Sequence, residues 1–107
     1  MENVLNTIYK VIVADSVWND IERIYEYYLT QSMSHEVQRM MKERLLRSIF
    51  GLSFMPYSYP LVFGLSEYNY RKTFCGDYVI PFLIDEDTKT ILVSRVFHGR
   101  SNYQDYL

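Results

Sequence analysis

The sequence predicts a single α+β domain in which an antiparallel pair of helices packs on one face of a β-sheet. Two observations predict this class. One short apolar strand and two segments with helical spacing fill the first half of the chain, and segments typical of antiparallel strands fill the second half. In addition, the 107 residues are 49% hydrophobic, which suits one small core and argues against disorder. We therefore expect one domain over residues 1–107.

The first two predicted elements are a strand and a helix. The segment IYKVIV, residues 8–13, is short, β-branched and almost continuously apolar, which is typical of a strand buried on both faces. Asp15 or Ser16 is a suitable N-cap for the next element. Apolar residues then recur every three or four positions to about Thr30, which predicts an amphipathic helix. Three acidic residues are expected on its outer face: Asp20, Glu22 and Glu26.

A second helix, of opposite charge, is predicted from Ser34 as its N-cap to about Leu52. Its basic residues are Arg39, Lys42, Arg44 and Arg47. Residues 15–31 contain four acidic and one basic residue, whereas residues 34–52 contain two acidic and four basic ones. This opposition favours an antiparallel helical hairpin. Such a basic stripe is more often a solvated face than a binding surface, and His35 is likewise expected at the surface.

Three antiparallel strands are predicted after an apolar loop with prolines at 56 and 60: residues 68–75, 78–84 and 90–97. Gly76-Asp77 suits the first hairpin turn, and the polar residues 85–89 form the second. Pro81 cannot donate a backbone hydrogen bond, so either a bulge or an unpaired side is expected there. The sheet face away from the helices is expected to be partly open and to carry the polar alternates of the strands.

Composition excludes several classes of function. The net charge of −2 argues against charge-driven binding of nucleic acid in general, although a local basic face remains compatible with it. The one cysteine, Cys75, forbids an intrachain disulfide, suits a reducing cytoplasm and is expected to be a packing residue. The first ten residues do not resemble a signal peptide, and no apolar run has the length of a membrane span.

Motifs for several kinds of active site are also absent from the sequence. It contains no P-loop, no GxGxxG and no GxSxG, and its two histidines have no cysteine or histidine at a spacing that suits zinc. We therefore expect no metal and no cofactor. The 11 tyrosines have two open interpretations, a protein interface or a cover over a small core.

The polar residues of the predicted sheet are the candidate site: Arg71, Lys72, Arg95, His98, Arg100 and Tyr103. Metal-free cleavage of RNA needs a proton-transfer group and cations for the phosphate, which His98 and the arginines could supply. Tyr103 could cover them from a short terminal turn capped by Ser101, and could stack on a base. The alternative is structural: Arg95 pairs with an acidic residue of a neighbouring element, and His98 only ends a strand.

Three segments, in the predicted order of elements, resemble the RelE/ParE superfamily of bacterial toxins: MPYSYP at 55–60, YRKTFCGDYVIPFLID at 70–85 and ILVSRVFHGRSNY at 91–103. The resemblance covers about residues 9–103 and implies a two-layer RelE-like fold with the strands in one sheet. It also implies a small cytoplasmic toxin of a type II toxin–antitoxin pair, bound and neutralised by a cognate antitoxin in a hetero-oligomer. RelE-type members cleave messenger RNA on the ribosome without metal, whereas ParE-type members inhibit DNA gyrase.

The resemblance also assigns candidate roles. If the protein is a ribonuclease, His98, Arg100 and Tyr103 would be catalytic; in either case Arg71, Lys72 and Arg95 would bind substrate or target. RelE-type ribonucleases commonly have an arginine at the position of Val79, and they are usually basic. These two departures favour a ParE-like gyrase inhibitor. The alternatives are a ribosome-dependent endoribonuclease and a non-toxic relative that only binds antitoxin.

Overall fold

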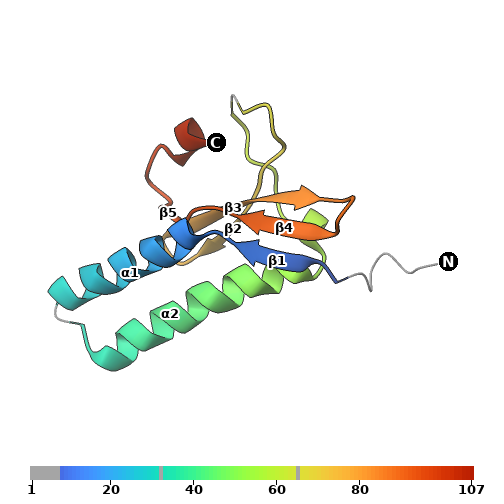
Figure 1. Cartoon of the computed structure of the whole chain (residues 1–107). Helices are drawn as coiled ribbons and strands as arrows, with labels where there is room; N and C mark the ends of the chain where they lie inside the picture. The colour runs from blue at the N-terminus through green and yellow to red at the C-terminus, as the bar shows by residue number, and fades with distance from the viewer. Residues whose placement is uncertain (1–7, 32, 65) are drawn as a thin grey trace.

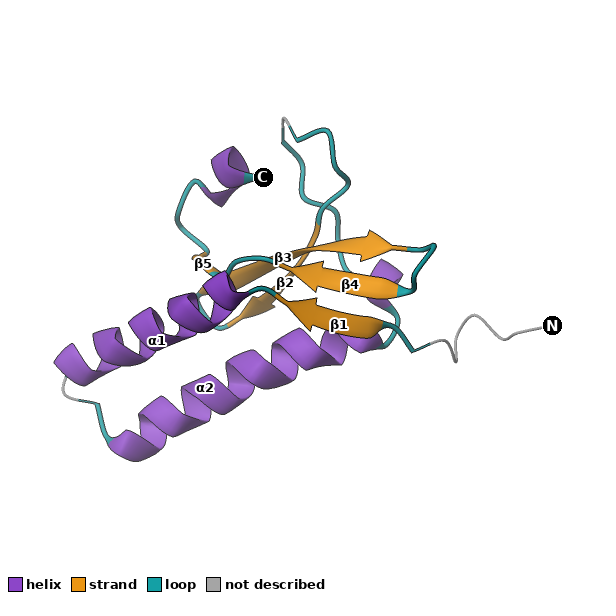
Figure 2. Ribbon diagram, in the orientation of Figure 1, coloured by secondary structure: helices purple, strands orange, loops and turns teal. Residues whose placement is uncertain are grey.

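The computed structural model describes residues 8–31, 33–64 and 66–107. A helical hairpin lies under one face of a β-sheet, while residues 60–64, residues 66–70 and the C-terminal turn stand above the other face (Figures 1 and 2). The elements are β1 (Lys10–Val13), α1 (Asp15–Thr30), α2 (His35–Phe50), β2 (Arg71–Cys75), β3 (Tyr78–Asp85), β4 (Thr90–Val93) and β5 (Phe97–His98). Short 3₁₀ turns are η2 (Gly51–Ser53), η3 (Pro56–Ser58) and η4 (Tyr103–Tyr106). The predicted α+β class and order of elements are confirmed.

The sheet is mixed, in the order β1-β4-β3-β2. β1 runs parallel to β4, whereas β3 is antiparallel to β2, β4 and β5. β5 follows β4 along the same side of β3, so one side of β3 is paired with two short strands in succession. This arrangement brings the end of the chain back to the start of β3.

β1 differs from its prediction. It lies at an edge of the sheet rather than in the interior, and Ile12 is 44% exposed. The prediction of burial on both faces is therefore wrong. The physical reason is that the helices cover only one face, and β1 has a neighbouring strand in the named sheet on one side only. Ile8 is outside the strand and makes an isolated bridge to Phe54.

The N-cap predictions for the two helices had different outcomes. Ser34 caps α2 as predicted, because its Oγ accepts a hydrogen bond from the Val37 amide at 3.2 Å. The N-cap of α1 is Ala14, which makes no side-chain cap, so the prediction of Asp15 or Ser16 is wrong. Ser16 instead donates its hydroxyl to the Ser94 carbonyl, which ties the start of α1 to the segment after β4.

The core lies between the hairpin and the sheet. Apolar residues at helical spacing on α1 and α2 meet alternate residues of β3 and β4, in agreement with the two predicted periodicities. Its fully buried members include Val17, Ile21, Leu45, Ile49, Ile80, Phe82, Ile91 and Val93. Cys75 is buried beside them, which confirms it as a packing residue.

The last predicted strand, residues 90–97, is broken in the structure. Val93 pairs with Phe82, and Phe97 pairs with Val79, so three residues on one side oppose two on the other. This is a β-bulge, one of the two features predicted from Pro81. The Lys72 amide donates to the Pro60 carbonyl, so Lys72 and Pro81 face each other without exchanging hydrogen bonds. The nitrogen of Pro81, which has no hydrogen, therefore faces the bulge.

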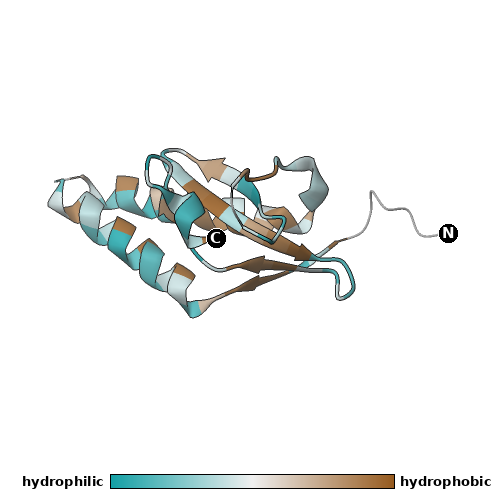
Figure 3. Ribbon diagram, turned by 90° about the horizontal axis from the view of Figure 1, so that it is seen from above, coloured by the Kyte–Doolittle hydropathy of each residue, from teal (hydrophilic) through white to brown (hydrophobic). Residues whose placement is uncertain are grey.

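The open face of the sheet is more apolar than predicted. Ile12, Leu92 and Leu83 are aligned across β1, β4 and β3 on the face away from the helices, and Leu92 is 37% exposed. The expectation that this face carries mainly polar residues is wrong, because both alternates of these strands are apolar. Figure 3, a view from above, shows the strands mostly in the colour of hydrophobic residues. None of the described helices is long and apolar enough to cross a membrane.

Candidate functional site

The bulge between β4 and β5 is held by a buried carboxylate from α1. Asp20 is 4% exposed, and its Oδ2 accepts hydrogen bonds from Arg95 Nε at 2.8 Å and from the Val96 amide at 2.9 Å. The predicted place of Asp20 on the outer face of the helix is therefore wrong. The pair raises the pKa of the Arg95 guanidinium, chiefly through this hydrogen bond. Arg95 thus makes the ion pair with a neighbouring element that was one of its two sequence interpretations.

The position of His98 follows directly from the bulge. In an unbroken strand the side chain of residue 98 would point to the open face of the sheet, because residue 93 points to the helices and side chains alternate. One extra residue reverses this alternation. His98 therefore pairs with Tyr78 and lies on the same face as the helices, with its ring edge-on to that of Tyr78 at 5.7 Å.

The surroundings of His98 are aromatic. Tyr27, Tyr28 and Tyr78 line a hollow with it between α1 and the turn that joins β2 and β3. Burial and a hydrogen bond with Tyr28 raise the pKa of Tyr78. The Nδ1 of His98 accepts a hydrogen bond from the backbone amide of Arg100 at 3.1 Å, which holds the exposed imidazole against its own turn.

Lys72 and Tyr103 form a separate pair on the opposite face. Lys72 Nζ donates to the Tyr103 hydroxyl at 3.2 Å and lies 5.5 Å from the centre of the Phe74 ring. Tyr103 is 4% exposed and stacks on Phe97 at 6.1 Å, so it packs on the sheet rather than over His98. The short turn that carries Tyr103 is present as predicted, but its N-cap is Asn102 and not Ser101.

The two remaining arginines have different environments. Arg71 Nη1 donates to the Tyr57 and Tyr59 carbonyls at 3.1 and 2.6 Å, so this guanidinium holds the loop before β2. Arg100 is exposed, and within residues 8–31, 33–64 and 66–107 its side chain makes no hydrogen bond or ion pair. Arg100 is therefore the arginine of the set that is free to contact another molecule.

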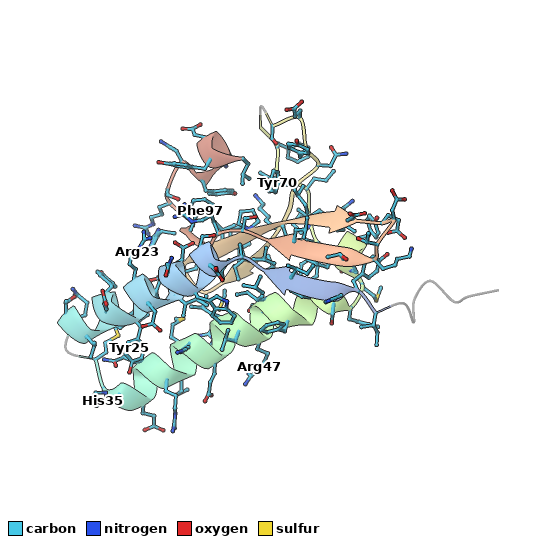
Figure 4. All side chains as sticks on the ribbon, viewed as in Figure 1. Arg23, Tyr25, His35, Arg47, Tyr70 and Phe97 are labelled. Atoms are coloured by element: carbon cyan, nitrogen blue, oxygen red, sulfur yellow. The ribbon has the colours of Figure 1, made fainter. Side chains whose placement is uncertain are left out.

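Four of the six predicted site residues form two groups and not one centre: Arg95 and His98 line one hollow beside α1, and Lys72 pairs with Tyr103. His98 lies on the helix-covered face, whereas Lys72 and Tyr103 lie on the open face. A proton-transfer group and the cations that stabilise a phosphate must converge within hydrogen-bond reach of one substrate. Figure 4 places Phe97 above the sheet and the basic helix residues His35 and Arg47 far from it, so the stripe on α2 is not part of either group.

A comparison with protein families identifies the family to which this chain belongs. The family model described as the ParE toxin of type II toxin–antitoxin system, parDE, matches residues 11–103. The chain belongs to the ParE toxin family. The resemblance to the RelE/ParE superfamily is therefore confirmed, and both groups of candidate residues lie within the part of the chain that matches the ParE family. No curated protein matches the sequence.

Solved structures of toxin–antitoxin systems share the fold of this ParE-family chain. The chromosomal ParDE system from Pseudomonas aeruginosa is similar with a TM-score of 0.67 and 15% identity, over 87% of this chain and 98% of that one. The RelBE2 complex from Mycobacterium tuberculosis has a TM-score of 0.61 and 17% identity, over 87% and 93%. The archaeal RelE–RelB complex from Pyrococcus horikoshii has a TM-score of 0.58 and 15% identity, over 88% and 99%. At these identities the likeness shows the fold alone.

Sequence reasoning missed the role of Asp20, which holds the bulge of this ParE-family chain at Arg95 and Val96. A signal for it is present in the sequence. Asp20 stands three residues after Val17 and four before Ile24, within the apolar stripe of α1. A lone carboxylate at a core position needs a partner, and Arg95 was already a candidate to pair with an acidic residue of a neighbouring element.

Proposed function

We propose that this ParE-family protein inhibits growth by binding DNA gyrase, and that a cognate antitoxin neutralises it in a toxin–antitoxin complex. Membership of the ParE family supports the gyrase target over messenger RNA. The antitoxin partner is supported by the solved structures of the same fold, which are described as toxin–antitoxin complexes or systems.

The separation of His98 from Lys72 and Tyr103 is the observation that carries the proposal. An RNase of this fold would need these groups on one phosphate, and the bulge sends His98 to the other face. Val79, the position where RelE-type ribonucleases commonly have an arginine, is fully buried against Phe97 and Tyr103. An arginine at this position would have no route to solvent, so it could not contribute a cation to a phosphate site.

In this account the C-terminal residues are contacts without chemistry. Arg100 extends into solvent, and the imidazole of His98 is exposed beside Tyr27. Arginine, tyrosine and histidine at a small exposed site suit a protein partner, because each has both apolar surface and hydrogen-bonding groups. Lys72, which lies 5.5 Å from the centre of the exposed Phe74 ring, is the feature that favours the second candidate, an RNA-binding site, since a lysine and an exposed aromatic ring can hold a phosphate and a base.

The test is a supercoiling assay with purified gyrase and the purified chain, together with mapping of messenger cuts in cells that express the chain. We expect loss of supercoiling activity, relief by the antitoxin encoded beside the gene, and no ribosome-dependent cuts. Normal supercoiling with new messenger cuts would replace this proposal with the RelE-type ribonuclease. Normal growth and normal supercoiling with antitoxin binding retained would identify a non-toxic relative.

A further inference from the structure

The open face of the sheet has an apolar row at the end away from the candidate site. Ile12, Leu92 and Leu83 stand opposite one another on β1, β4 and β3, and the first two are 44% and 37% exposed. No described helix covers them, because both long helices lie on the other face (Figure 2). Adjacent exposed apolar side chains on a small domain are a feature of binding surfaces.

An acidic wall borders this row. An open hollow of about 490 Å³ lies between the loop 66–69 and the turn after β3, with Leu83 and Leu92 among its lining residues. Four of its nine lining residues are acidic, and none is basic: Glu67, Asp85, Glu86 and Asp87. Glu86 is already paired with Lys89 and accepts a hydrogen bond from the Tyr9 hydroxyl. The other three carboxylates have no ion-pair partner among the described residues.

The geometry of this wall is fixed by local contacts. The Oδ1 of Asp85 accepts hydrogen bonds from the Asp87 and Thr88 amides at 3.1 and 3.3 Å, which closes the turn. On the opposite side, Ser66 Oγ accepts from the Tyr68 amide at 3.1 Å, and the rings of Tyr68 and Tyr70 meet edge to face at 6.5 Å. These contacts shape both sides of the hollow.

We propose that this surface, made of the Ile12–Leu92–Leu83 row and the carboxylates of Glu67, Asp85 and Asp87, docks a basic amphipathic segment of a protein partner. The charge of the wall selects lysine and arginine, and the exposed row selects apolar side chains between them. A helix with leucines at positions i, i+4 and i+7 places such side chains on one stripe and its cations on both flanks. The inference does not depend on gyrase as the target, because it concerns the other end of the open face.

The probe is a synthetic peptide with leucines at i, i+4 and i+7 and lysines beside them, added to the isotope-labelled full chain. Its control replaces each lysine with glutamate. We expect amide shifts confined to β1, β4, the end of β3 and the loop 66–69, with no binding of the glutamate peptide. Glu67→Gln with Asp87→Asn should weaken binding about five- to tenfold at low salt, since both contacts lie on an exposed rim.

A second variant tests the apolar row. Ile12→Thr with Leu92→Thr places β-branched threonine, which suits a strand, at both positions and should abolish measurable binding. The matched controls are Glu22→Gln with Glu26→Gln and, separately, Met40→Gln, which change exposed carboxylates and an exposed apolar side chain on the helices. These controls should bind the peptide as the native chain does.

The proposal would be overturned by equal binding of both peptides, by shifts centred on the helical hairpin, by binding unchanged in both surface variants, or by a native dimer that Ile12→Thr with Leu92→Thr converts to a monomer. The last would make a second copy of the chain the occupant. Stronger peptide binding after deletion of residues 1–7 would also overturn it, because the chain's own first residues would then be the occupant.

Discussion

The carboxylate of Asp20 ties the start of the C-terminal segment to α1. It joins α1 to residues 75 and 76 positions later in the chain, through the Arg95 guanidinium and the Val96 amide. The second of these donors lies within the bulge opposite Ile80 and Pro81. Asp20 thus satisfies a backbone group that a broken strand would leave buried without a partner.

Asp20→Asn should lower the free energy of unfolding by about 2 to 3 kcal/mol, because the neutral amide forms weaker hydrogen bonds and leaves Arg95 without its counter-charge. Urea unfolding followed by circular dichroism measures this change. The control is Glu22→Gln, which removes an exposed contact of 3.7 Å with Lys42 and should change stability by less than about 0.5 kcal/mol. Equal effects of the two substitutions would show that the buried contacts of Asp20 add nothing.

At the scale of the elements, sequence patterns correctly predicted the features that neighbouring residues determine, such as helix ends and turns. Helix α1 ends at Thr30 and the second helix is capped by Ser34, as their periodicity and capping signals indicate. The turn at Gly76-Asp77 was likewise predicted from residue type, and the bulge opposite Pro81 was one of the two features expected there. The position of β1 at an edge was not predicted. An apolar, β-branched segment suits a strand in the interior of a sheet and an edge strand covered on one face equally well, so the sequence pattern does not distinguish them.

The hairpin between β2 and β3 gives a prediction at this scale. Gly76 has a φ of +57°, so Gly76→Ala should destabilise the protein by about 1 kcal/mol through backbone strain. Gly51, at the end of α2, has a φ of −66° and no atom within 4 Å of an added Cβ. Gly51→Ala should therefore leave stability unchanged or raise it by about 0.5 kcal/mol. Thermal unfolding of both variants tests the difference in sign; a loss of stability in Gly51→Ala equal to that in Gly76→Ala would contradict it.

At the scale of the whole molecule, one inserted residue decides which groups meet. The sequence contains the residue types that an RNase site would need. The sequence pattern correctly placed Lys72 on a strand and His98 at the end of the last strand. It could not assign them to faces, because the face of His98 depends on a register change opposite Pro81. The burial of Tyr103 on Phe97 is also a tertiary result, since an aromatic residue in a polar terminal turn has no local pattern that predicts it.

Growth arrest by the His98→Gln variant, compared with that by Arg100→Ala, tests the central claim most directly. Glutamine keeps a hydrogen-bonding group at residue 98 but cannot transfer a proton at neutral pH, and general acid–base catalysis is worth about 10² to 10⁴ in rate. For a gyrase inhibitor whose C-terminal residues act only as contacts, we predict that His98→Gln arrests growth almost as well as the native chain, whereas Arg100→Ala, which loses an exposed charged contact, arrests it less. Nearly complete loss of arrest with folded His98→Gln would contradict the account and establish His98 as a proton-transfer group.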